Sequence, residues 1–262
     1  MLTKLKKQYL LFNYAISFFS RIPVAKTTDF SAYPFHLSNA YFPAVGAIYA
    51  LLVSIVFMLS DSVLGESVVS IILMLVAGLL LTGALHEDGV ADACDGFGGG
   101  YNKKQYLAIM KDSHIGTYGV LGLITLFSLK VSLLSQLSTQ GYVAFFSVIF
   151  CASVFSRFSA LLLMQYSEYA RDDESSKSSA SSQCLPAQYL CVAFITALFS
   201  LLLMPNMLIL MIIIVVGLST YLCKRYFDNK IGGYTGDCLG FLQQLNEVLI
   251  LLMSLAWWHS LS

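Results

Sequence analysis

The sequence predicts an all-α protein, a polytopic helical bundle embedded in a membrane. Apolar residues make up 57% of its 262 residues and charged residues only 11%, against about 45–50% and about 25% in soluble domains. The mean hydropathy is +0.74. We expect a single domain over residues 1–262, with a lipid bilayer around it. Because the formal net charge is zero, we expect no nucleic-acid partner.

Several apolar stretches are long enough to cross a hydrocarbon core of about 30 Å. The expected spans are residues 41–60, 67–86, 118–138, 142–164, 187–204, 206–223 and 239–258. Residues 8–25 are also apolar, but Arg21 and Pro23 interrupt their end. We therefore expect an interfacial or re-entrant helix there, and leave open whether it crosses the membrane. The expected fold is a bundle of about seven transmembrane helices with this additional N-terminal helix.

Basic residues gather in alternate connections between these spans, among them Lys4, Lys103, Lys111 and Arg171. Short loops rich in lysine and arginine remain in the cytoplasm. The connection at 61–66 has no basic residue and is expected on the outer side. This pattern predicts a multi-pass protein of the cytoplasmic (inner) membrane with its active site facing the cytoplasm.

The most unusual stretch is residues 86–96, where four carboxylates directly follow an apolar run. Asp88, Asp92 and Asp95 are spaced i, i+4 and i+7, so on a helix they share one face. Three like charges on one stripe repel each other by roughly a few tenths of a kcal/mol per pair. A hard divalent cation bound through oxygens, such as Mg²⁺, would neutralise them. The alternative is a solvated loop whose acids bind nothing.

Two further polar segments adjoin expected spans. Lys111, Ser113 and His114 precede one span, and their side chains suit contacts with phosphate oxygens; the alternative is a polar cap before a helix. The segment 232–240 contains four glycines and Asp237. It forms either a second substrate-binding edge or an ordinary loop that ends at a helix start.

A few polar residues lie inside or directly beside the expected spans. Arg157, Glu247 and Lys130 lie inside them, and ionisable residues at membrane depth indicate function by default. Lys130 is nevertheless expected to snorkel to the interface. His86 adjoins the acids and is either a general base for a hydroxyl group or a hydrogen-bonded structural residue. The residues thus predict a membrane-embedded, metal-dependent enzyme that acts on a phosphorylated substrate.

Three motifs together resemble those of one known family. They are residues 86–99, 110–119 and 232–240. Smaller matches follow the same order, at 19–23, Arg157 and 169–171. This set is similar to that of the cobalamin synthase family, the adenosylcobinamide-GDP ribazoletransferases, and it extends over nearly the whole chain. Two departures are Cys94, where the family usually has a small residue without a thiol, and His114, where arginine is common.

The resemblance implies a reaction, a cofactor and partners. Enzymes of this family join adenosylcobinamide-GDP to α-ribazole or to its 5′-phosphate, with Mg²⁺ as the cofactor. The products are adenosylcobalamin, or its 5′-phosphate, and GMP. A homo-oligomer, or a complex with other enzymes of cobalamin assembly, is a further expectation.

Within that frame, each polar residue receives an expected role. Metal ligands are expected at Glu87, Asp88, Asp92, Asp95 and Asp237. Catalytic residues are expected at Asp88, Asp92, Asp95 and His86. Either His86 or an aspartate takes the hydroxyl proton of the acceptor. Substrate contacts are expected at Arg21, Lys111, Ser113, His114, Arg157, Arg171, Thr235 and Asp237.

Two other functions stay open. The acidic motif is loosely similar to that of the CDP-alcohol phosphotransferases, but their Asp-Gly-x-x-Ala-Arg sequence is lacking, because Asp92 follows Asp88-Gly89-Val90-Ala91. The other function is that of a secondary transporter, suggested by the many spans and the few charges inside them. Transporters bind substrate near the bilayer midplane, whereas the charges here gather at one face.

Overall fold

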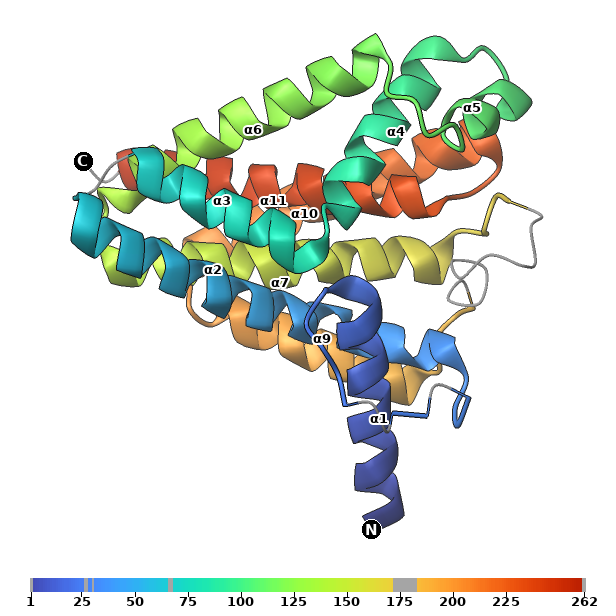
Figure 1. The fold of residues 1–262 in the computed structure, drawn as a ribbon, viewed down its shortest axis with the longest axis horizontal. Coiled ribbons are helices and arrows are strands. Elements are labelled where there is room, and N and C mark those ends of the chain that lie inside the picture. Colours follow the sequence, from blue (N-terminus) through green and yellow to red (C-terminus); the bar gives the residue numbers. More distant parts are fainter. Residues whose placement is uncertain (1, 26–27, 30, 66–67, 172–182, 261–262) are drawn as a thin grey trace.

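The computed structural model describes residues 2–25, 28–29, 31–65, 68–171 and 183–260, and the regular elements in these ranges are all helices (Figure 1). In chain order they are α1 (Leu2–Phe19), η1 (Phe35–Tyr41), α2 (Phe42–Leu64), α3 (Val68–Thr82), α4 (Leu85–Gly99), α5 (Lys103–Ile109), α6 (Thr117–Ser138), α7 (Tyr142–Tyr166), α9 (Ala187–Leu201), α10 (Asn206–Ile231) and α11 (Gly236–His259). The described residues contain an isolated backbone bridge between Tyr169 and Tyr234, but no strand. The predicted all-α fold is therefore confirmed.

Within the part of the chain that the structure describes, five helical segments are each long and apolar enough to cross a membrane. They are the continuous segment Phe35–Leu64, which joins η1 to α2, and helices α6, α7, α10 and α11. The bent pair of α3 and α4 makes a sixth if it counts as one broken span. Helix α9 has 15 residues, roughly 22 Å at the usual rise per residue, which is shorter than a hydrocarbon core. The polytopic bundle is confirmed, whereas the expected number of about seven spans stays a prediction.

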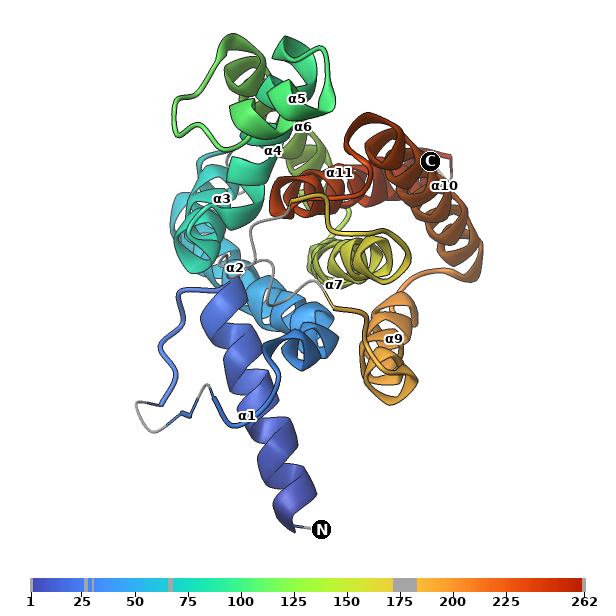
Figure 2. The same cartoon turned by 90° about the vertical axis from the view of Figure 1, so that its right-hand side faces the viewer.

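The long helices run side by side, and α7 occupies the middle of the bundle (Figure 2). It packs against α2, α11 and α9, and it is the most buried of the candidate spans. Close packing on α2 requires a glycine, because a Cβ on Gly46 would lie 2.5 Å from the backbone oxygen of Ser153. The bundle thus forms a rigid frame for the polar residues at its end.

Helix α1 lies across the direction of the long helices (Figure 1) and packs against η1 and α2. This orientation fits the expected interfacial helix. Its bounds differ from the expected 8–25, because it begins at Leu2 and ends at Phe19. Lysine is a good helix former, so the three N-terminal lysines extend the helix before its apolar part. The chain leaves the helix before Arg21 and Pro23, as those residues predict.

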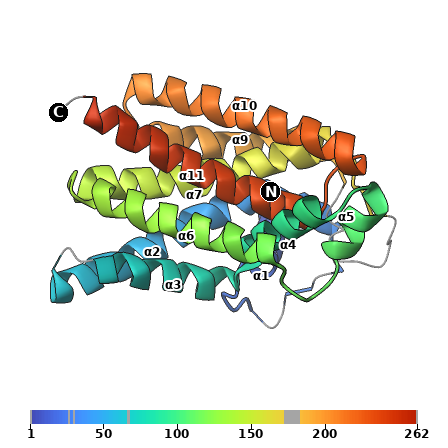
Figure 3. The same ribbon diagram turned by 90° about the horizontal axis from the view of Figure 1, so that it is seen from above.

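The expected span at 67–86 is wrong at its C-terminal end. Helix α3 stops at Thr82, and α4 leaves it at an angle of 89°. Gly83 (φ +67°) and Ala84 (φ +59°) both adopt the left-handed conformation, which ends a right-handed helix and redirects the chain. The N–H of Arg21 donates to the carbonyl of Leu81 at 2.7 Å, near this break. As a result α4 lies at the end of the bundle where α11 begins (Figure 3).

Candidate functional site

Helix α4 carries Asp88, Asp92 and Asp95 in the helical register that their spacing predicts. Their accessibility decreases along the helix, because Asp88 is exposed, Asp92 is half-buried and Asp95 is buried. Helix α6 packs along α4 and accounts for this trend. The first two carboxylates are therefore the ones of this stripe that are open to a ligand.

Helices α4 and α11 touch at two glycines. A Cβ on Gly89 would lie 2.9 Å from the backbone oxygen of Asp237 and 3.1 Å from the Cα of Gly240. A Cβ on Gly240 would lie 2.9 Å from the backbone oxygen of His86. Small residues permit such close approach between membrane helices. The contact sets the two accessible carboxylates of α4 beside the first turn of α11.

Asp237 lies in that first turn and is held by two neighbours. Thr235 caps α11, since its hydroxyl oxygen accepts a hydrogen bond from the N–H of Cys238 at 3.4 Å. The same hydroxyl donates to the Asp237 carboxylate at 3.2 Å. Nη2 of Arg171 lies 2.7 Å from Oδ2 of Asp237 and forms an ion pair with it. Asp237, Thr235 and Arg171, each predicted to contact substrate, are thus brought together.

Arg171 reaches the site through a short backbone pairing. The N–H of Ala170 donates to the carbonyl of Tyr234 at 2.9 Å, and the N–H of Tyr234 donates to the carbonyl of Glu168 at 2.8 Å. Nη2 of Arg171 also lies 3.5 Å from the carbonyl oxygen of Met110. The three long sequence motifs, which are far apart along the chain, therefore meet at one place.

The carboxylates of this site lie close enough to influence each other. Burial, followed by the charges of Asp237 and Asp88, raises the pKa of Asp92 to about 7. Asp92 belongs to α4, the polar half of the bent pair, and lies outside the five continuous apolar spans. Arg171 offsets part of the negative charge and is already paired with Asp237. Three carboxylates around one paired guanidinium leave an excess of negative charge, which a bound cation would remove.

Asp95 has both carboxylate oxygens engaged. Oδ2 accepts from the N–H of Gly116 at 2.6 Å, and Oδ1 accepts from the N–H of Gly119 at 2.8 Å. A Cβ on Gly116 would lie 2.5 Å from the carboxylate, so the contact depends on a glycine. A carboxylate at a helix N-terminus satisfies N–H groups that have no partner within the helix. Asp95, predicted as a metal ligand, instead ties α4 to the start of α6.

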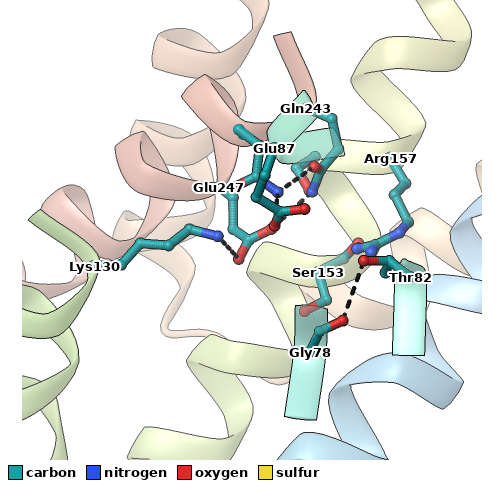
Figure 4. A network of polar contacts seen from close by, with 10 residues as sticks. Gly78, Thr82, Glu87, Lys130, Ser153, Arg157, Gln243 and Glu247 are labelled. Carbon is teal, nitrogen blue, oxygen red and sulfur yellow. Dashed lines mark hydrogen bonds and ion pairs between the residues drawn. The ribbon is translucent and has the colours of Figure 1, made fainter. Parts of the chain in front are cut away.

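Glu87, also predicted as a metal ligand, is buried and belongs to a polar network inside the bundle (Figure 4). Its Oε1 accepts from Nε2 of Gln244 at 3.0 Å. The adjacent Gln243 donates to Oε2 of Glu247 at 2.7 Å. Sequence reasoning missed both glutamines, although two adjacent amides within an apolar span are a visible signal. The Glu87 side chain therefore takes part in the buried polar network and not in the cluster of accessible carboxylates.

Two cations complete this network. Nζ of Lys130 lies 2.8 Å from Oε1 of Glu247. The prediction that Lys130 snorkels is wrong, because it is 1% exposed and finds its counter-charge inside the bundle. Arg157 donates to the backbone oxygen of Ser153 at 2.7 Å and lies 4.8 Å from the ring centroid of Tyr49. Arg157 was predicted to contact substrate, but the structure encloses it in protein.

The residues Lys111, Ser113 and His114 lie on the exposed loop between α5 and α6. Nδ1 of His114 lies 2.7 Å from Oδ1 of Asp112. This hydrogen bond and the charge of Asp112 raise the pKa of His114. The loop begins beside Arg171, so its side chains stand at the same end of the bundle as the open carboxylates.

A cavity of about 260 Å³ lies between α1, α2, α4, α7 and α11. Asp88, Asp237 and Arg171 form its polar side. The remaining walls are mostly apolar or aromatic and include Phe18, Phe19, Phe42, Leu85, His86, Met164, Tyr234 and Leu239. The cavity thus joins the charged groups to an aromatic compartment.

His86 lines this cavity, and Arg21 lies at the nearby turn before α4. His86 is buried and stacks on Phe42, with 5.7 Å between the ring centroids. Neither ring nitrogen of His86 has a hydrogen-bond partner among the described residues. Arg21 is exposed, and its guanidinium covers the turn at Gly83, where a Cβ would lie 2.9 Å from its Cζ. Both predicted residues therefore lie close to the start of α4.

The open carboxylates do not form a closed cage made of protein ligands alone. No group of three His, Cys, Asp or Glu side chains in the described ranges converges as a preformed metal site. A structural zinc site, by comparison, is closed by four protein ligands. A Mg²⁺ ion usually needs only one or two carboxylates, together with water and phosphate oxygens of a substrate.

Comparison with known proteins adds the family to this geometry. The sequence model described as cobalamin-5-phosphate synthase matches residues 11–255. This chain belongs to that family. The resemblance drawn from the three sequence motifs is therefore confirmed.

Other members of the cobalamin-5-phosphate synthase family match along nearly their whole length. A protein of Shewanella frigidimarina is 38% identical over 250 residues, which cover 95% of each chain. A protein of Pseudoalteromonas atlantica is 37% identical over 250 residues, which cover 95% of this chain and 92% of the relative. One from Vibrio cholerae is 38% identical over 253 residues, which cover 97% and 96%. All three are named adenosylcobinamide-GDP ribazoletransferase, and no solved structure matches the chain.

Proposed function

We propose that this protein joins adenosylcobinamide-GDP to α-ribazole, or to its 5′-phosphate, and releases GMP. The product is adenosylcobalamin or its 5′-phosphate. The observation that carries the proposal is the meeting of three family motifs at one site, from α4, from the loop after Met110 and from the start of α11. The names of the relatives support the same substrates for this chain.

The reaction is a substitution at phosphorus. The ribose hydroxyl oxygen forms a bond to the phosphorus nearer cobinamide, and the bond from that phosphorus to the bridging oxygen breaks. GMP leaves with the bridging oxygen, and a protein base receives the hydroxyl proton. Catalysis of such transfers consists mainly of positioning and charge stabilisation. Arg171, Arg21 and Lys111 supply positive charge toward the pyrophosphate, which arginine can bind with two hydrogen bonds.

Asp88, Asp92 and Asp237 are the residues that would hold Mg²⁺. They fit this ion because Asp88 and Asp92 are accessible oxygen ligands beside Asp237, and the three together carry an excess of negative charge. Their repulsion also contributes to the raised pKa of Asp92. Bound Mg²⁺ supplies charge stabilisation for phosphoryl oxygens. Asp95 is left out of this set because both of its oxygens accept backbone hydrogen bonds. Glu87 is left out because its side chain is buried and accepts from Gln244 inside the bundle.

Either His86 or one of the accessible aspartates takes the hydroxyl proton. His86 has spare hydrogen-bonding capacity in the cavity wall, and the aspartates lie where the phosphoryl group would sit. A His86→Gln variant separates these roles, because glutamine keeps the polarity but does not act as a base. Retention of the transfer rate in that variant assigns the base to an aspartate.

We place the site on the cytoplasmic face of the inner membrane. Lys103, Lys111 and Arg171 stand at the end of the bundle that carries the site, and basic loops remain in the cytoplasm. Association with a second copy, or with other enzymes of cobalamin assembly, stays part of this proposal. Labelling of a cysteine introduced at Ser113 in right-side-out and inverted vesicles tests the orientation.

The decisive experiment uses the purified full chain in nanodiscs. Adenosylcobinamide-GDP is supplied with α-ribazole or with its 5′-phosphate, with and without Mg²⁺, and GMP and the cobalamin product are measured together. We expect equal amounts of both products, and only when Mg²⁺ is present. GMP without a cobalamin product would indicate hydrolysis instead of transfer. A folded preparation that forms neither product would contradict the proposal, and CDP-alcohol donors would be assayed next.

A further inference from the structure

The cavity beside the carboxylates has two unlike ends. Asp88, Asp237 and Arg171 make one end polar. At the other end, Phe18 and Phe19 come from the C-terminus of α1, which places the N-terminal helix in contact with the site. No role proposed so far for the charged residues explains why aromatic side chains surround the rest of the cavity.

The aromatic wall is an ordered stack built from three helices. Phe19 of α1 stacks on Phe42 of α2, with ring centroids 4.0 Å apart and planes 21° from parallel. Phe42 stacks in turn on His86 of α4, at 5.7 Å and 25°. Phe18 stands edge-on against Phe19 at 4.9 Å. Parallel and edge-on surfaces of this kind suit a further flat aromatic group.

We propose that the aromatic end of this cavity binds the base of the nucleoside acceptor, a flat bicyclic aromatic group with apolar substituents. The inference rests on the proposed function and specifies where its second substrate lies. With the base against the rings, the ribose extends toward Asp88, Asp237 and Arg171. The ribose hydroxyl then stands at the polar end, where the phosphoryl group is transferred.

The chemistry of the wall distinguishes this base from guanine. Guanine carries a carbonyl, an amino group and a ring N–H on its edges, and burying these groups without partners is costly. Apart from His86 and Tyr234, the wall around Phe18, Phe19, Phe42, Met164 and Leu239 offers only apolar side chains to that edge. The dimethylbenzimidazole of α-ribazole has methyl groups on its outer edge and no hydrogen-bond donor, and its one free ring nitrogen is a single acceptor. The base of the acceptor therefore fits the wall better than the base of the leaving nucleotide.

The size of the cavity distinguishes the base from the corrin. Its volume of about 260 Å³ lies just below the range of about 300–1,000 Å³ for sites that hold drug-sized ligands. Such a space accommodates one nucleoside but not a corrin ring. The corrin therefore stays outside, and only its phosphate end approaches the carboxylates.

The test measures the Michaelis constants of both substrates in variants of the wall. Phe18→Leu and Phe19→Leu keep apolar volume and remove the flat ring. Loss of one aromatic stacking contact with a base should raise KM for α-ribazole about tenfold and leave KM for adenosylcobinamide-GDP unchanged. Phe12→Leu is the matched control, because Phe12 lies on the same helix but packs against Tyr41, outside the cavity.

A second measurement uses the unmodified protein and needs no turnover. Equilibrium dialysis of α-ribazole against the nanodisc protein should show binding that free dimethylbenzimidazole displaces and guanosine does not. Displacement by guanosine, or a raised KM for adenosylcobinamide-GDP in the wall variants, would overturn the inference and assign the cavity to the leaving nucleotide. Absence of GMP formation by the unmodified protein would instead refute the proposed function, whereas the dialysis result still decides the subsite.

Discussion

Two adjacent residues of α4 belong to regions with opposite charge balance. Glu87 lies in the buried network, where its charge and that of Glu247 are matched by Lys130 and Arg157 (Figure 4). Asp88 lies in the open site, where three carboxylates surround one paired arginine. A balanced cluster needs no further partner, whereas an unbalanced one favours a cationic ligand. The comparison separates carboxylates that hold the bundle together from carboxylates that bind.

The largest expected effect concerns folding and comes from the balanced region. Lys130→Met leaves the buried Glu247 without its cation, and breaking a buried pair in this way costs about 3–5 kcal/mol. Thermal unfolding in nanodiscs measures this loss. The double variant Lys130→Met/Glu247→Gln is the control, since it removes both charges and should regain most of the stability. Equal losses in the single and double variants would show that charge balance is not what the pair contributes.

Removing a charge from the open region should affect turnover instead. Asp92→Asn deletes a proposed metal ligand, and we expect the transfer rate to fall about 10²–10³-fold, as when one group that stabilises developing charge is lost. The unfolding temperature without Mg²⁺ should stay equal or rise, because like-charge repulsion is relieved. Asp228→Asn is the control, since Asp228 pairs with Lys224 on α10 and accepts from Ser167, and it does not line the cavity. If Asp92→Asn lost as much stability as Lys130→Met, the two regions would not differ in what their carboxylates contribute.

The glycine contact that joins the site to α11 predicts a smaller change. Gly89→Ala places a Cβ 2.9 Å from the backbone oxygen of Asp237, so the two helices must separate. A shift of the carboxylates by a fraction of an ångström should lower kcat/KM about tenfold. Gly217→Ala on α10 is the control, because its Cβ meets nothing within 4 Å. Unchanged kinetics in the first variant would mean that the helix contact does not fix the site.

The smallest expected effect concerns the exposed pair of Asp112 and His114. Because Asp112 raises the pKa of His114, the pair stabilises the loop below the ordinary histidine pKa of about 6.5. That contribution is lost as the pH rises through the raised pKa. In Asp112→Asn the pKa of His114, measured by NMR titration of the imidazole, should fall toward its ordinary value. A pKa that does not move would place its cause elsewhere in the loop.

Local features of the site could be predicted from the sequence. The spacing of Asp88, Asp92 and Asp95 determines their shared helix face, because helical periodicity is a local property. Apolar length predicts the long helices, and the family motifs indicate which segments carry polar function. The break after Thr82 was missed although Gly83 marks it, since an apolar run alone does not show where a helix turns.

Long-range features could not be predicted in the same way. The pairing of Lys130 with Glu247 joins α6 to α11, and no local pattern links two residues so far apart in the chain. The use of Asp95 by the N–H groups before α6 also depends on how the helices pack. A shared helix face therefore gave three carboxylates the same predicted role, while packing assigns one of them to structure.

Because the contact between Gly89 and Gly240 joins α4 to α11, the site cannot form until α11 has been synthesised. Asp88 and Asp92 of α4 leave the ribosome well before Asp237 and Gly240, which belong to α11. A nascent chain that stops before α11 thus carries two of the three open carboxylates without the third. The proposed transfer therefore requires α11 as well as α4, and a nascent chain that has not reached α11 should not consume the nucleotide-activated substrate.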